Sequence, residues 1–282
     1  MRHTDRNRSR SARGVAYGFA MLISCVAVST KAADWSDNSV GYRYGTQFTE
    51  PGNPSDIQKD IFSFTHVSGY KYGINFFTVD FLLSDDKDPP AGGGGGAQEI
   101  YAVYRHQLIY GAVTGKPMAF GPIKDIALTA GFDLNSKNDA FAPRVRKFML
   151  GPTFKFDVPG FLDLSLLFRG ERNHNGIVGK SVKFDNTYGI SLAWGIPIKP
   201  LGAKFDGFLD HVGKKGKDGF GLETAAETLM RAYIMFDVGR FAGKKDTFYA
   251  GVGYEYWRNK FGAASGPGND TNAPVLALEA HF

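Results

Sequence analysis

Aromatic rings and charged groups recur at even spacings along several short segments of this 282-residue chain. Tyr101 and Arg105 are four residues apart, and Arg231 and Tyr233 are two apart. On a β-strand an even spacing places side chains on the same face. A surface of rings and charges can stack on a planar solute and hydrogen-bond its polar groups, so these spacings indicate binding chemistry rather than bond cleavage.

The segments that carry these residues alternate between apolar and polar positions, which predicts β-strands with one apolar and one polar face. In residues 124–134, for example, Ile126 and Leu128 share one face and Asp125 and Thr129 share the other. About twelve such segments occur, and many are near ten residues long, the length of a tilted strand that crosses a bilayer. Their approximate spans are 38–45, 61–68, 72–83, 99–110, 123–134, 147–158, 161–172, 187–196, 203–212, 228–238, 247–258 and 274–282.

The connections between these segments alternate in length. Long polar connections are expected at 46–60, 84–98, 135–146, 173–186, 213–227 and 259–273. Shorter ones are expected at 69–71, 159–160, 197–202 and 239–246, and only 111–122 breaks the trend. Short periplasmic turns that alternate with long external loops are typical of outer-membrane barrels, so the sequence predicts an all-β, antiparallel, up-and-down transmembrane barrel of about twelve strands. A soluble β-sandwich or a lipocalin-like barrel would also alternate, but with shorter strands and an apolar interior.

The first 32 residues are predicted to be a secretory signal peptide. Five arginines precede an apolar run, and a small-residue cleavage site ends at Ala32. An alternative is a lipoprotein cut before Cys25, which would become lipidated. Removal of residues 1–32 takes away the whole net charge of +5 and the one cysteine. The remaining domain, residues 33–282, is therefore close to neutral, which argues against nucleic-acid binding, and no disulfide or thiolate metal site is expected.

The chain ends in the alternating segment "PVLALEAHF". Termini usually fray in water, and we expect this segment to be held as the strand that closes the barrel against the first one. A terminal Phe282 after alternating apolar residues is similar to the signal that the bacterial barrel-assembly machinery reads, so that machinery is an expected partner.

Three stretches resemble one known family: "DWSDNSVGYRYGTQFTEP", "FTHVSGYKYGINFFTVDFLLSDDKDPP" and "AQEIYAVYRHQL". They are similar to the Tsx-like, nucleoside-specific, channel-forming outer-membrane proteins. The resemblance covers residues 34–110 and implies a Gram-negative outer-membrane channel that admits nucleosides. Several members of that family serve as phage or colicin receptors, so a surface receptor or adhesin with its function in the external loops is the alternative.

The lumen can be assigned from the alternation alone, because the polar face of each strand should line the interior if the apolar face meets lipid. An alternative, purely structural interpretation is that the inward aromatic rings fill a narrow barrel and that the inward charges form ion pairs that stabilise it. The predicted pore-lining residues are Phe76, Tyr101, Arg105, Arg169, Phe208, Arg231, Tyr233, Tyr249 and Trp257.

No catalytic constellation accompanies this pattern. His174 lies in a predicted external loop with no serine motif beside it, and "GGGGG" at 92–96 lacks the lysine and helix of a phosphate loop. We therefore expect a monomeric channel that needs no cofactor or metal, whose partners are outer-membrane lipid and small solutes.

Overall fold

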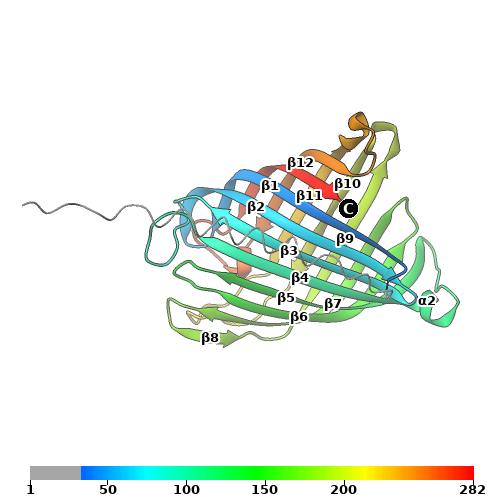
Figure 1. The fold of residues 1–282 in the computed structure, drawn as a ribbon. Helices are drawn as coiled ribbons and strands as arrows, with labels where there is room; N and C mark the ends of the chain where they lie inside the picture. Colours follow the sequence, from blue (N-terminus) through cyan, green and yellow to red (C-terminus); the bar gives the residue numbers. More distant parts are fainter. Residues whose placement is uncertain (1–32) are drawn as a thin grey trace, which may run out of the picture. The chain divides into compact units, whose positions relative to one another are not determined.

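The computed structural model describes residues 33–282; the predicted signal peptide, its cleavage site and Cys25 lie outside the described residues. Antiparallel strands follow one another around a single sheet, and the sheet closes because β6 also pairs with β7 (Figure 1). The strands are β1 (Trp35–Glu50), β2 (Asn53–Tyr70), β3 (Gly73–Ser84), β4 (Gln98–Ile109), β5 (Ile123–Lys137), β6 (Arg144–Phe156), β7 (Phe161–Asn175), β8 (Lys180–Lys183), β9 (Thr187–Ile198), β10 (Ala203–Val212), β11 (Glu227–Asp237), β12 (Phe248–Arg258) and β13 (Thr271–His281).

Twelve of the thirteen described strands form the barrel wall. The exception is β8, a four-residue strand that pairs only with the C-terminal end of β7. The first and last strands close against each other, with Val40 opposite Ala280 and Tyr44 opposite Leu276. The predicted antiparallel barrel, and its closure by the terminal strand, are confirmed.

The two ends of the barrel differ in their connections. One end carries the long connections after β3, β7, β10 and β12 and a six-residue connection, 138–143, after β5. We refer to it as the external end because long loops lie outside the cell in such barrels. The other end carries short turns together with the longer connection 110–122, which contains the helix α2 (Tyr110–Thr114). The 3₁₀ turns η1 (Lys199–Leu201) and η2 (Gly239–Ala242) also lie there, while η3 (Lys260–Gly262) lies at the external end. In the predicted turn between β6 and β7, Gly160 has φ +80°, and a Cβ there would lie 2.0 Å from the carbonyl oxygen of Gly195.

The first connection corrects a sequence prediction. Residues 46–60 were expected to form a long loop, but β1 continues to Glu50, and β2 begins at Asn53. Only Pro51 and Gly52 separate the strands, and Gly52 takes a φ of +87°, which glycine tolerates readily. The alternation was interrupted because the pairing of β1 with β2 shifts register between Gly45 and Phe48 and again between Phe48 and Glu50.

The outer surface of the wall is a band of exposed apolar side chains. Members of this band from strands around the barrel are each at least 37% exposed: Val40, Phe81, Leu128, Phe132, Leu166, Phe168, Ile234, Leu276 and Leu278. A continuous apolar surface of this kind is unfavourable in water and suits the hydrocarbon of a bilayer. Among the described residues, no helix has the length and apolarity needed to cross a membrane. The barrel is thus an integral outer-membrane fold, as the sequence predicted.

Candidate functional site

The inward positions of the wall alternate with the exposed apolar band. On β11, Arg231 and Tyr233 are partly buried, whereas Ile234 is 41% exposed. Met235 is fully buried and continues the inward series. Because residues opposite each other in a ladder share a face, the same alternation extends around the barrel through the register of neighbouring strands. All nine predicted pore-lining residues lie at inward positions by this criterion.

Four charged side chains meet in the barrel interior, and we call them the central ion cluster: Arg43, Asp80, Arg231 and Glu255. Arg43 Nη2 lies 2.5 Å from Asp80 Oδ2, and Arg231 Nη1 lies 3.3 Å from the same oxygen. Arg231 also donates from Nε to Glu255 Oε2 at 2.6 Å. Two guanidinium groups and two carboxylates therefore balance in charge, and all four side chains are at most 16% exposed.

The contact between Arg231 and Asp80 crosses the barrel interior. Arg231 lies on β11 and Asp80 on β3, and the sheet order places β12, β13, β1 and β2 between these strands along the shorter path. Two strands so far apart in a twelve-strand barrel face each other across the lumen. The central ion cluster therefore narrows the lumen at its own level.

Aromatic groups border the central ion cluster. Arg43 Nη1 donates to the Tyr233 hydroxyl at 3.3 Å. The guanidinium carbon of Arg231 lies 5.9 Å from the centre of the Phe208 ring, within cation–π range. Charges and rings thus share one section of the lumen, which is the combination that the sequence pattern indicated.

A second group of predicted residues lies on the adjoining wall, in β4 to β7. Arg105 Nη1 lies 2.6 Å from Asp133 Oδ1, and the Tyr101 hydroxyl donates to Asp133 Oδ2 at 3.3 Å. Lys147 Nζ donates to the Tyr101 hydroxyl at 3.4 Å. Arg169 lies between two carboxylates: its Nη2 is 3.9 Å from Asp133 Oδ2, and its Nη1 is 4.0 Å from Asp210 Oδ2. These groups are held by one another, so Asp133 organises this side of the lumen.

Phe76 borders the second group, because it lies opposite Arg105 in the register of β3 and β4. Two further predicted residues, Tyr249 and Trp257, lie nearer the two ends of β12. Tyr249 lies near the end opposite the external loops, where Lys204 Nζ is 4.6 Å from its ring centre. Trp257 is eight residues further along β12 and therefore about 26 Å away along the strand. The nine residues are distributed along the lumen and do not form one compact site.

The external end of the lumen contains a cluster that the sequence did not reveal, which we call the external lysine cluster: Glu50, Lys59, Lys137 and Lys260. Glu50 Oε1 lies 2.6 Å from Lys59 Nζ, 3.2 Å from Lys260 Nζ and 3.5 Å from Lys137 Nζ. Burial lowers the pKa of Lys260, which lies in η3 outside the wall strands, and the neighbouring Lys59 adds to that effect. Lys260 Nζ also approaches the rings of Trp257 and Phe261, at 4.8 and 5.3 Å.

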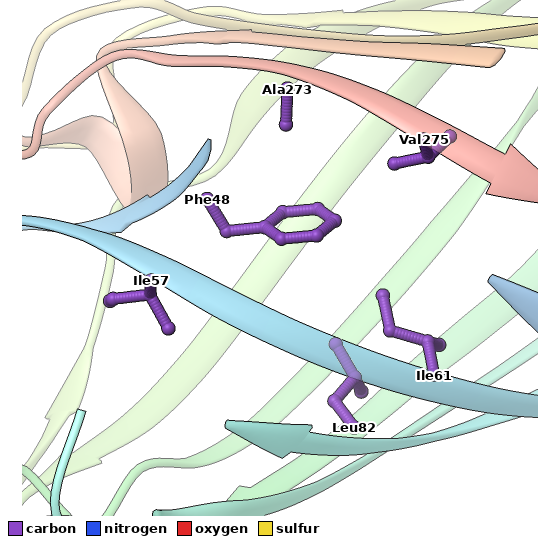
Figure 2. Close-up of a cluster of buried hydrophobic side chains, with 6 residues drawn as sticks. All are labelled: Phe48, Ile57, Ile61, Leu82, Ala273 and Val275. Carbon is purple, nitrogen blue, oxygen red and sulfur yellow. The ribbon is translucent and has the colours of Figure 1, made fainter. Parts of the chain in front are cut away.

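An apolar cluster lies beside these lysines. Figure 2 shows the ring of Phe48 among side chains from β2, β3 and β13. Phe48 is 2% exposed although Tyr42 and Tyr44, also at even positions, lie on the outward face of the same strand. The register shift after Gly45 thus turns Phe48 inward. The members are Phe48, Ile57, Ile61, Leu82, Ala273 and Val275.

The sequence missed Arg43 and the lysine cluster for identifiable reasons. Arg43 lies in a predicted strand, but it had no charged neighbour at an even spacing to mark the inward face. Lys59, Lys137 and Lys260 all fell in segments that were expected to be external loops. The extension of β1, β2 and β5 beyond their predicted ends brings the first two into the wall.

Comparison with known proteins agrees with the architecture. Neither protein-family models nor curated protein sequences give a match to this chain. The COG4313 outer membrane channel from Pseudomonas putida F1 has a TM-score of 0.51 and 11% identity, over 90% of this chain and 97% of that chain. The NanC porin has a TM-score of 0.46 and 10% identity, over 87% and 99%. The KdgM porin has a TM-score of 0.43 and 11% identity, over 86% and 99%. At 11% identity, the similarity to the Pseudomonas protein concerns the fold alone, which in this chain is a closed, antiparallel outer-membrane barrel.

Proposed function

We propose that this barrel is an outer-membrane channel for small polar solutes without net charge, and that nucleosides are among them. The observation that supports the proposal is the central ion cluster with its bordering rings. Its two guanidinium groups and two carboxylates cancel, while Tyr233 and Phe208 offer ring faces at the same level. A nucleoside has a planar base that can stack and a sugar that can hydrogen-bond, and stacking of a base on an aromatic side chain contributes about 1–3 kcal/mol.

The charge balance explains why a neutral solute would be preferred. Arg43 is ion-paired with Asp80, and Arg231 is ion-paired with Glu255. A phosphate group that enters this section of the lumen therefore has no unpaired cation to bind. Such a group would lose hydration without gaining a free partner, and loss of hydration is costly for a charged group in a confined space. Nucleoside monophosphates should therefore pass or bind less well than nucleosides.

The geometry also offers a route to opening. Arg231 makes a closer contact with Glu255 on the adjacent strand than with Asp80 across the lumen, 2.6 Å against 3.3 Å. Asp80 Oδ2 also lies 2.5 Å from Arg43 Nη2, so Asp80 would remain paired with Arg43. If the cross-lumen contact separates, every charge retains a partner. Opening at this level therefore does not leave an isolated charge, the situation that is most costly in a low-dielectric interior.

A second candidate function is that of a surface receptor or adhesin. The observation that favours it is the apolar cluster around Phe48, which together with the external lysine cluster fills part of the lumen at the external end. A barrel that stays closed there would expose its external loops while passing no solute.

Single-channel recording in planar bilayers distinguishes the two candidates. The channel proposal expects discrete conductance steps, which nucleosides block transiently at micromolar to millimolar concentrations, equivalent to about 4–8 kcal/mol of binding. Tyr233→Ala and Phe76→Ala should each weaken the block. Tyr104→Ala is the matched control, because Tyr104 packs on Phe132 of the exposed band.

Two results would contradict the proposal in different ways. A resolved open-channel current that nucleosides leave unchanged would refute the nucleoside assignment and leave a channel for other solutes. Absence of any conductance from correctly folded barrel would favour the receptor function.

A further inference from the structure

Three cationic side chains form a row across the outside of the barrel, near its external end. Arg146 on β6 lies directly opposite Arg172 on β7, and Arg172 lies directly opposite Lys183 on β8. Residues that are opposite in a ladder share a face. This face is the outer one, because the next residues along β6 and β7, Lys147 and Glu171, point into the lumen, where Lys215 pairs with Glu171. We call Arg146, Arg172 and Lys183 the basic row.

The basic row is electrostatically unfavourable by itself. Directly opposite side chains in a ladder have Cβ atoms about 5 Å apart, and like charges in that arrangement destabilise the pairing. All three side chains are exposed, and none forms a salt bridge with a carboxylate of residues 33–282. Arg144, which is also exposed and lies on the same face of β6 two residues before Arg146, adds to the positive charge. The arrangement is therefore short of anions, and an external anion would stabilise it.

The position of the basic row indicates where that anion comes from. On β6 the next outward residue after Arg146 is Phe148, which is 51% exposed, and on β7 the apolar band begins at Phe168, which is 54% exposed. The row thus lies at the external margin of the apolar band, the level of lipid headgroups in a barrel of this kind. Arginine suits phosphate because its planar guanidinium can donate two parallel hydrogen bonds.

We propose that the basic row binds the phosphate groups of the glycolipid that forms the outer leaflet of the outer membrane. The acyl chains of that lipid would lie on the apolar band below, beside Phe148 and Phe168, while its phosphates occupy the three cations. This inference depends on the orientation of the barrel in the membrane and does not depend on whether its lumen conducts.

The test is binding of synthetic lipid A to the folded barrel in detergent, followed by native mass spectrometry. Three probes are compared: the diphosphoryl form, the dephosphorylated form and inorganic phosphate alone. The wild-type barrel should retain the diphosphoryl form at least about tenfold more tightly than the dephosphorylated form, given the attraction of several cations for an anionic headgroup. Inorganic phosphate in the millimolar range should not displace it, because the acyl chains supply part of the binding.

Variants assign the effect to the row. The triple variant Arg146→Gln, Arg172→Gln and Lys183→Gln should lose the preference for phosphate, and Arg172→Gln alone should reduce it. Arg172→Lys should keep most of it. Arg258→Gln is the matched control, because Arg258 is an exposed cation near the external end of β12 whose register partner on β11, Thr228, is uncharged.

Equal retention of the diphosphoryl lipid by wild type and by a correctly folded triple variant would overturn the proposal. Equal affinity of the wild-type barrel for the phosphorylated and dephosphorylated probes would also overturn it, because binding would then depend on the acyl chains alone. Should the triple variant fail to fold, the single Arg172→Gln variant decides the question by the same comparison.

Discussion

Asn38 and Phe282 exchange two main-chain hydrogen bonds, from Phe282 N to Asn38 O at 2.8 Å and from Asn38 N to Phe282 O at 3.2 Å. The last residue of the described chain is thereby fastened to the beginning of the first strand. His281 adds a contact between its Nδ1 and Asp37 Oδ2 at 2.9 Å. These contacts complete the seam between β1 and β13, where a closed barrel has no free edge.

Deletion of Phe282 should reduce assembly of the folded barrel, because it removes both hydrogen bonds at this end of the seam and the terminal aromatic residue. The measurement is the fraction of heat-modifiable, folded protein on electrophoresis of outer membranes without boiling. Phe282→Tyr, which keeps the main chain and the ring, serves as the control. Normal yield and mobility of the deletion variant would show that the terminal residue does not contribute to assembly.

Leu166→Arg should destabilise the barrel by about 2–4 kcal/mol, the cost of an arginine near the bilayer midplane on the lipid face. Leu166 is 44% exposed within the apolar band. The free energy of unfolding is measured by urea titration in lipid vesicles, with Leu166→Phe as the apolar control. An unchanged unfolding free energy for the arginine variant would mean that this face does not meet hydrocarbon.

Arg231→Gln should increase single-channel conductance and lower stability by about 3–5 kcal/mol, the usual cost of leaving a buried charge without its partner. The unpaired group would be Glu255, which is 5% exposed in its side chain. The double variant Arg231→Gln and Glu255→Gln should recover much of the stability and keep the larger conductance. If the single variant conducts as wild type does, the central ion cluster does not limit the current.

Glu50→Gln should destabilise the external end of the lumen, because one carboxylate serves three buried lysines. Lys137 would retain Asp88 and Asp139, at 2.9 and 3.0 Å, whereas Lys59 would lose the only salt bridge that it forms among the described residues. We expect a loss of about 3–5 kcal/mol in the free energy of unfolding. A change in tryptophan fluorescence should accompany it, because Trp257 lies against Lys260.

Asp246→Asn is the control for this experiment, since Asp246 forms an ion pair with Lys245 in which both side chains are at least 67% exposed. A loss of stability as small as that of the control would show that the lysines do not depend on Glu50.

The sequence by itself determined the class of fold and the facing of most strands. The alternation of apolar and polar residues is a local property of the sequence, because successive side chains of a strand point to opposite faces of the sheet. The apolar face is the outer one because it contacts the hydrocarbon of the bilayer. Arg231, Tyr101 and Asp133 could be placed inward for this reason. The closing strand was equally accessible, because its alternation is unbroken up to the last residue.

Only the tertiary structure decided which inward groups meet. Asp80 and Arg231 are far apart in the sequence and on strands that do not pair, so their contact depends on the closure and register of the whole barrel. The inward turn of Phe48 follows from a shift in the pairing of β1 with β2, which changes the face of every later residue in the strand. The alternation of one strand does not show such a shift, because the extra residue in β1 becomes apparent only from its pairing with β2: an advance of three residues from Gly45 to Phe48 lies opposite an advance of two from Lys59 to Ile57.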